Sequence, residues 1–122
     1  MILVDTSIWI DHFRLADLTL SHALRDGQVL VHPFVLGELA LGVISVRDLA
    51  LSYLSLLPAP VAATPDEILG FIERRQLHGS GVGYVDAHLL ASALLTPDAR
   101  LWTRDRRLSG VAESLGIAFT PK

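Results

Sequence analysis

The sequence predicts an α/β fold, a three-layer α/β/α sandwich around a central, mostly parallel sheet of four or five strands. Short apolar runs typical of buried strands occur at 2–4, 29–31, 100–103 and 117–119. Longer segments in which apolar residues recur at helical spacing separate these runs. Strands that alternate with helices indicate a parallel sheet covered by helices on both faces.

The composition is that of a single domain without cysteine chemistry. A chain of 122 residues is long enough to bury a core without disulfides, so we expect one domain over 1–122. Cysteine is absent, which excludes thiolate nucleophiles, zinc–thiolate clusters and redox pairs. No apolar run approaches the ~18 residues that cross a bilayer, and no signal-peptide core follows Met1. We therefore expect a cytoplasmic protein that does not contact membranes.

The first apolar run ends in Asp5-Thr6-Ser7, after which apolar residues resume and a helix is expected. Taken alone, Asp5 has two interpretations. It could be a cap that accepts hydrogen bonds from the free N–H groups of that helix. It could instead be a functional acid delivered to the edge of the sheet by the strand, in which case we expect Thr6 or Ser7 to cap the helix. A second helix is predicted over 17–26, and the strand at 29–31 follows it.

The helix predicted over 33–44 carries an acid in an unfavourable place. Pro33 suits the first turn of a helix, and nearly all other side chains of the segment are apolar. Glu38 lies in the middle, and no basic residue stands three or four positions away on either side. Because a buried, unpaired carboxylate is costly, we expect Glu38 to find a partner elsewhere in the fold.

Two helices are predicted in the middle of the chain, over 46–57 and over 64–78. The first has a wide apolar face at helical spacing. The second begins with a capping box, in which Thr64 and Glu67 satisfy each other's backbone N–H groups. The glycine-rich segment 79–83 lacks the lysine and hydroxyl residue of a phosphate loop, so no nucleotide site is predicted there.

Two further acids stand beside the last predicted elements. Asp86 lies in the first turn of a helix expected over 87–95. Asp105 follows the strand at 100–103 and precedes a helix expected over 106–115. Each of these acids, considered separately, is also explained as a helix cap.

We therefore expect all four acids at one edge of the predicted sheet. Strands lead to two of them, and open parallel sheets bind ligands at the carboxyl ends of their strands. Several acids at one edge repel one another unless a cation lies between them, and oxygen ligands without thiolates select Mg²⁺ or Mn²⁺. The chemistry that follows is hydrolysis of a phosphodiester by metal-activated water. The candidate catalytic residues and metal ligands are Asp5, Glu38, Asp86 and Asp105.

Four motifs along the chain resemble the PIN domain family, and more narrowly its VapC-type ribonuclease toxins. They are Val4-Asp5-Thr6-Ser7, Gly37-Glu38-Leu39, Val85-Asp86-Ala87 and Thr103-Arg104-Asp105, in the family's order. The resemblance implies an Mg²⁺- or Mn²⁺-dependent endoribonuclease, the toxin of a type II toxin–antitoxin pair, whose metal is held by the four acids. It also implies that the hydroxyls of Ser7 and Thr103 support this site or touch the scissile phosphate.

Some neighbouring residues have a functional and a structural interpretation. Arg104 and the two arginines after Asp105 could contact RNA phosphates, or they could form a solvated helix face. His88 is expected to be structural, because its place on the helix points it away from the acids. Trp9 and Trp102 adjoin strand segments and are expected in the core.

The resemblance also implies partners, namely RNA as substrate and a cognate VapB-type antitoxin protein. A mean hydropathy of +0.45 is high for a monomer of this size and indicates an apolar face covered by a partner. Either the antitoxin or a second copy could cover it, and we expect a homodimer. The alternative function is a non-catalytic PIN-like binding or assembly module. A phosphatase with Asp5 as nucleophile is disfavoured, because it would need a second acid in place of Ser7.

Overall fold

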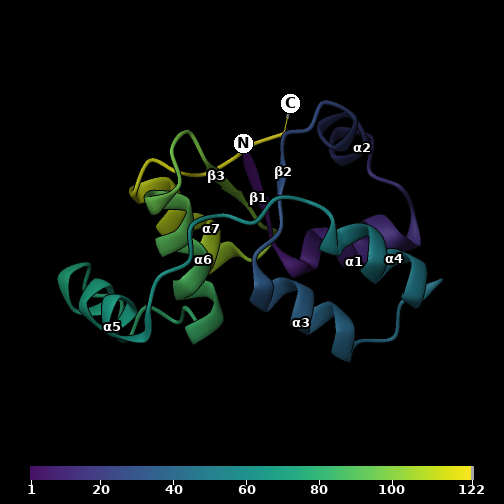
Figure 1. Cartoon of the computed structure of the whole chain (residues 1–122). Coiled ribbons are helices and arrows are strands. Elements are labelled where there is room, and N and C mark those ends of the chain that lie inside the picture. The colour runs from purple at the N-terminus through teal and green to yellow at the C-terminus, as the bar shows by residue number, and fades with distance from the viewer. Residues whose placement is uncertain (122) are drawn as a thin grey trace.

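A parallel sheet with strand order β2-β1-β3 lies at the centre of the computed structural model, which describes residues 1–121 (Figure 1). Its strands are β1 (Ile2–Val4), β2 (Val29–Leu30) and β3 (Arg100–Trp102). In register, Leu3 lies opposite Leu30 on one side and Leu101 on the other. Because all strands run the same way, their carboxyl ends meet at one edge of the sheet.

The α/β class and the parallel sheet are confirmed, but the sheet is smaller than the predicted four or five strands. The described residues form three strands. The segment predicted as a strand at 117–119 makes a single parallel bridge between Ala118 and Leu101. Leu101 donates its N–H to the carbonyl of Ile117 and accepts a hydrogen bond from Phe119 N–H. The bridge does not extend because Pro121, shortly after it, has no N–H to continue a ladder.

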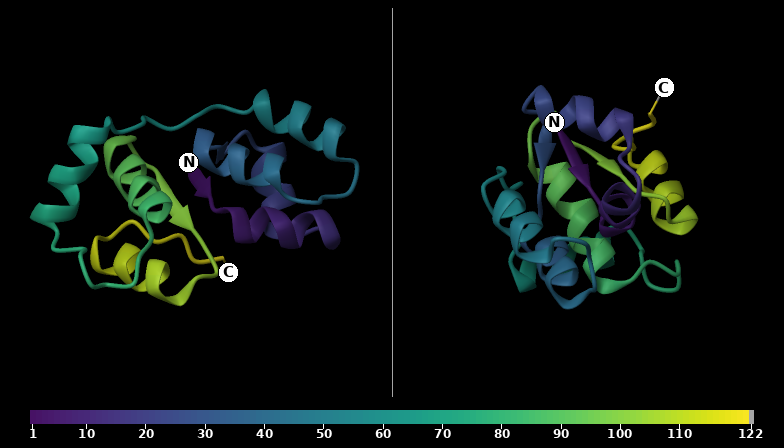
Figure 2. Two further views of the ribbon diagram at one scale, coloured as in Figure 1. Left: turned by 90° about the horizontal axis from the view of Figure 1, so that it is seen from below. Right: turned by 90° about the vertical axis from the view of Figure 1, so that its right-hand side faces the viewer.

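The helices found in residues 1–121 surround the sheet. They are α1 (Thr6–Arg14), α2 (Leu18–Arg25), α3 (Pro33–Leu41), α4 (Arg47–Ser55), α5 (Pro65–Arg74), α6 (Tyr84–Leu95) and α7 (Arg106–Ser114). Helices α1 to α4 lie on one side of the strands and α5 to α7 on the other (Figure 1), and the view from below keeps this division (Figure 2). The central strands are thereby covered from both sides.

Several helix ends differ from their predicted positions. Helix α3 ends at Leu41 rather than at residue 44, since Gly42 already has extended backbone angles. Helix α5 ends at Arg74 rather than at residue 78, because Gln76 adopts a left-handed conformation with φ of 53°. Helix α6 begins at Tyr84, earlier than predicted, so its first turn contains Asp86 as expected.

The core consists of the strands and of buried side chains from each of the helices α1 to α7. Trp9 and Trp102 are buried in it, as predicted. The core also takes in polar side chains: within residues 1–121, the Nε2 atoms of His32 and His88 and the Oγ of Ser92 are buried without a hydrogen-bond partner. No helix in the described part of the chain is long and apolar enough to cross a membrane.

Helix α6 provides a test of this core. Leu89 is 0% exposed, whereas Leu95 on the same helix is 44% exposed. We expect Leu89→Ala to lower the free energy of unfolding by about 2–5 kcal/mol, because it removes buried methyl groups and leaves a cavity. Leu95→Ala should change it by less than about 1 kcal/mol. Urea denaturation measures both values, and equal losses would contradict this packing.

Candidate active site

Asp5 is the most constrained of the candidate acids. It directly follows β1, and only 7% of its surface is exposed. Its Oδ1 accepts a hydrogen bond from Thr6 N–H at 2.7 Å. Its Oδ2 accepts from Ser7 Oγ at 3.3 Å and from Thr103 Oγ1 at 2.6 Å. Asp5 is therefore itself the cap of α1, which corrects the expectation that Thr6 or Ser7 would take over the capping.

Thr103 joins the two strand-end acids. It follows β3, and besides donating its hydroxyl proton to Asp5, its Oγ1 accepts a hydrogen bond from Asp105 N–H at 3.1 Å. Asp105 in turn caps α7, since its Oδ1 accepts from Leu108 N–H at 3.0 Å. The ends of β1 and β3 are thus tied together by one threonine side chain.

Glu38 is exposed, and the expectation that it is buried is therefore wrong. Although α3 is apolar, Glu38 lies on its solvent side, so burial does not force it to pair with a cation. Its partner is a hydroxyl: Thr6 Oγ1 donates to Glu38 Oε1 at 2.9 Å. Thr6 is a site residue that the sequence pattern did not single out. Its only signal was its position next to Asp5, where it could equally serve as a cap.

Asp86 lies within reach of the charges of the other three candidate acids. Its Oδ2 accepts a hydrogen bond from Gly83 N–H at 3.4 Å, at the start of α6. Burial raises the pKa of Asp86, and the negative charges of Asp5, Asp105 and Glu38 raise it further, while the Gly83 N–H opposes the rise. The structure thus brings the predicted acids into one field of negative charge.

The arginine predicted to flank this site has partners of its own. Arg104 Nε lies 2.6 Å from Asp11 Oδ2, and Arg104 Nη2 lies 3.6 Å from Asp17 Oδ2. Its backbone N–H donates to Ser7 Oγ at 3.4 Å. The guanidinium therefore binds the acids of α1 and the start of α2, which favours the structural interpretation of Arg104. The other ion pair within residues 1–121 joins Arg47 to Asp48, so none of these pairs neutralises the four candidate acids.

The donor atoms fit a hard divalent cation. All are carboxylate or hydroxyl oxygens, and the ion pairs of the described chain leave the carboxylates uncompensated. They do not form a closed cage, since no three acidic or histidine side chains among residues 1–121 converge closely enough to hold an ion by themselves. Mg²⁺ commonly binds through one or two carboxylates and completes its shell with water and substrate phosphate. An open, oxygen-lined site matches that preference.

The raised pKa of Asp86 generates a pH prediction for the metal-free protein. The folded protein holds this proton more tightly than the unfolded chain, so stability falls as the pH rises from the ordinary value of 3.8 through the raised pKa. With a chelator present, we expect Asp86→Asn to unfold at higher urea concentration than the wild type at pH 7. The difference should vanish near pH 3, where both side chains are neutral. A destabilised Asp86→Asn protein at pH 7 would contradict an unfavourable effect of burial and neighbouring charge on this carboxylate.

Comparison with known proteins identifies the family of the chain. The profile of the PIN domain matches residues 2–114. Ribonuclease VapC32 of Mycobacterium tuberculosis, strain CDC 1551 / Oshkosh, is 49% identical over 119 residues, which cover 98% of this chain and 96% of the relative. Ribonuclease VapC32 of strain ATCC 25618 / H37Rv shows the same identity and coverage. The chain therefore belongs to the PIN domain family, as a VapC-type member.

Proposed function

We propose that the protein is a metal-dependent endoribonuclease and the toxin of a toxin–antitoxin pair. One observation carries the proposed chemistry: the negative charges of Asp5, Glu38 and Asp105 reach Asp86, and no ion pair among the described residues compensates these four carboxylates. The ribonuclease name of relatives that match nearly the whole chain supports RNA as the substrate. The proposed metal is Mg²⁺ or Mn²⁺, bound by Asp5, Glu38, Asp86 and Asp105.

In the site, hydroxyl and N–H groups orient the carboxylates, and the carboxylates supply the negative charge. Thr6 N–H, Ser7 and Thr103 fix both oxygens of Asp5, so this carboxylate is held in place before any ligand binds. Thr6 also orients Glu38 through its hydroxyl. When bound, the divalent ion would supply Lewis-acid stabilisation of the phosphate and lower the pKa of a water nucleophile. In this proposal Ser7 and Thr103 are positioning residues, because their hydroxyls act through Asp5.

Surface features are compatible with the proposed protein partners. Exposed apolar side chains gather on the end of α3, on α4 and on the segment between them, and they include Leu41, Val43, Val46, Leu49 and Leu56. Such exposure is typical of an interaction surface. We propose a VapB-type antitoxin and a second copy of the chain as partners, and the cytoplasm as the location. The alternative, a non-catalytic PIN-like module, is disfavoured because all four acids and their hydrogen-bond donors are present.

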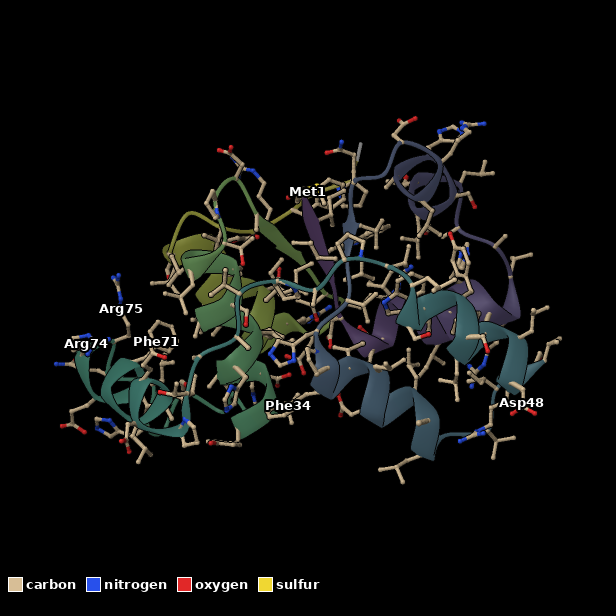
Figure 3. The ribbon with its side chains drawn as sticks, viewed as in Figure 1. Met1, Phe34, Asp48, Phe71, Arg74 and Arg75 are labelled. Atoms are coloured by element: carbon tan, nitrogen blue, oxygen red, sulfur yellow. The ribbon has the colours of Figure 1, made fainter. Side chains whose placement is uncertain are left out.

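Cleavage assays test the catalytic proposal. With Mg²⁺ or Mn²⁺ the purified protein should cut RNA, and chelation should stop the reaction. Asp5→Asn and Asp86→Asn should each lower the rate at least about a hundredfold, because each removes a ligand charge. Asp48→Asn is the matched control, since this exposed acid of α4 pairs with Arg47 at the outer end of the molecule (Figure 3). Full activity in the Asp5 and Asp86 variants, with folding verified by circular dichroism, would contradict these roles.

Thermal unfolding tests metal binding separately from activity. A ligand that binds only the folded state at a hundred times its dissociation constant stabilises a protein by about 2.7 kcal/mol. We therefore expect Mn²⁺ to raise the Tm of the wild type and of Asp48→Asn in a concentration-dependent way. The rise should be much smaller for Asp5→Asn and Asp86→Asn. Identical shifts in all four proteins would place the ion elsewhere.

A further inference from the structure

Two half-exposed aromatic rings lie on the helices that carry Glu38 and Asp86. Phe34 is 40% exposed and Tyr84 is 53% exposed. Phe34 lies on α3, one helical turn before Glu38 and on the same face. Tyr84 is the first residue of α6, two positions before Asp86. Figure 3 shows Phe34 at the boundary between α3 and α6.

A buried histidine supports both rings. The ring centroid of His88 lies 4.7 Å from that of Phe34 and 4.8 Å from that of Tyr84, and both pairs meet edge to face. His88 itself is 3% exposed. The two outer rings therefore rest on one fixed group, although they come from different helices.

His32 fixes Phe34 from the other side. Its Nδ1 accepts a hydrogen bond from Phe34 N–H at 2.9 Å, and the two ring centroids lie 4.9 Å apart. Burial, followed by the neighbouring His88, lowers the pKa of His32 to about 4, so the ring is neutral at pH 7 and its Nδ1 can accept. Fixed backbone and ring contacts reduce the conformational freedom that Phe34 would lose on binding a ligand.

We infer that Phe34 and Tyr84 form a nucleobase-stacking platform for a nucleotide next to the scissile phosphate of single-stranded RNA. The inference rests on the proposed endoribonuclease function, because the acids beside the rings would place that phosphate. Proteins recognise single-stranded RNA by stacking its bases on aromatic side chains. Tyr84 also borders a hollow of about 220 Å³, shared with Gly79, Val82 and Gly83, which leaves space beside its ring for a planar group.

The positions of the rings favour RNA over a protein partner as their ligand. An apolar partner surface would fit the exposed side chains of α4, such as Leu49 and Leu56, which offer a larger apolar area. In the platform, Phe34 lies one helical turn from Glu38 on the same face of α3, and Tyr84 begins α6, the helix that carries Asp86. A ligand that binds both features needs a planar apolar part close to an anion that a metal can bridge, which describes a nucleotide.

Fluorescent RNA tests the platform directly. We would use an oligonucleotide that the wild-type protein cleaves, with 2-aminopurine on either side of the cut, and measure binding with Ca²⁺ in place of Mg²⁺. Stacking on the platform should quench the 2-aminopurine. Phe34→Leu and Tyr84→Leu, which keep an apolar side chain but lose the ring, should reduce quenching and weaken binding about fivefold to a hundredfold. Phe34→Tyr and Tyr84→Phe should retain both signals.

Tyr53 provides the matched control, since it is an aromatic residue of α4 that is 46% exposed and is not part of the platform. Tyr53→Leu should bind and quench like the wild type, and unchanged Tm values would show that the leucine variants are folded. Leucine variants that bind RNA normally, while the wild type cleaves it, would overturn the platform alone. If the leucine variants bind RNA normally but no longer bind an inhibitory protein, the rings contact that protein, and the platform is again overturned. A wild type that neither binds nor cuts RNA would overturn the proposed function as well.

Discussion

The hydrogen bond from Thr103 Oγ1 to Asp5 Oδ2, at 2.6 Å, is the contact on which the rest of the site depends. It joins the end of β1 to the end of β3, which lie 98 positions apart in the chain. Asp5 also caps α1, and Thr103 also accepts from the cap residue of α7. One side-chain contact therefore fixes the starting points of two helices and the position of the most buried candidate acid. Among the described residues Oδ1 accepts one hydrogen bond, from Thr6 N–H, and keeps a second lone pair, so capping leaves this carboxylate able to bind a cation.

The sequence was most informative where local chemistry and topology agreed. Alternating strands and helices predicted the parallel sheet, and parallel strands bring their carboxyl ends together, so the meeting of Asp5 and Asp105 followed from topology. The capping box of Thr64 and Glu67 was also predictable, because it depends on four consecutive residues. The strand at 117–119 was not, since an apolar run does not reveal that only one of its residues bridges β3.

The side-chain partners were less predictable, because they depend on which face a helix turns to the core. Helix α3 is apolar nearly all round, so its pattern does not show whether Glu38 is buried, and only the packing of the helix places it in solvent beside Thr6. Arg104 is a similar case. Its position before Asp105 suggested a phosphate contact, but the side chain extends to Asp11 and Asp17, which belong to a distant part of the sequence.

The pairing of Arg104 away from the four acids distinguishes their cluster from a structural network of ion pairs. A guanidinium beside the four acids would neutralise them permanently and remove the charge that attracts a cation. Here Arg104 is paired with Asp11 and Asp17 instead. The candidate ligands are oriented by neutral donors, namely the hydroxyls of Thr6, Ser7 and Thr103 and the N–H groups of Thr6 and Gly83. Neutral donors fix the direction of a carboxylate without cancelling its charge. The fold thereby keeps the acids ordered without compensating their charge, and the raised pKa of Asp86 reflects its burial first and the repulsion by the other three acids second. In the proposed function, a divalent cation would relieve the repulsion on Asp86 that these uncompensated charges produce.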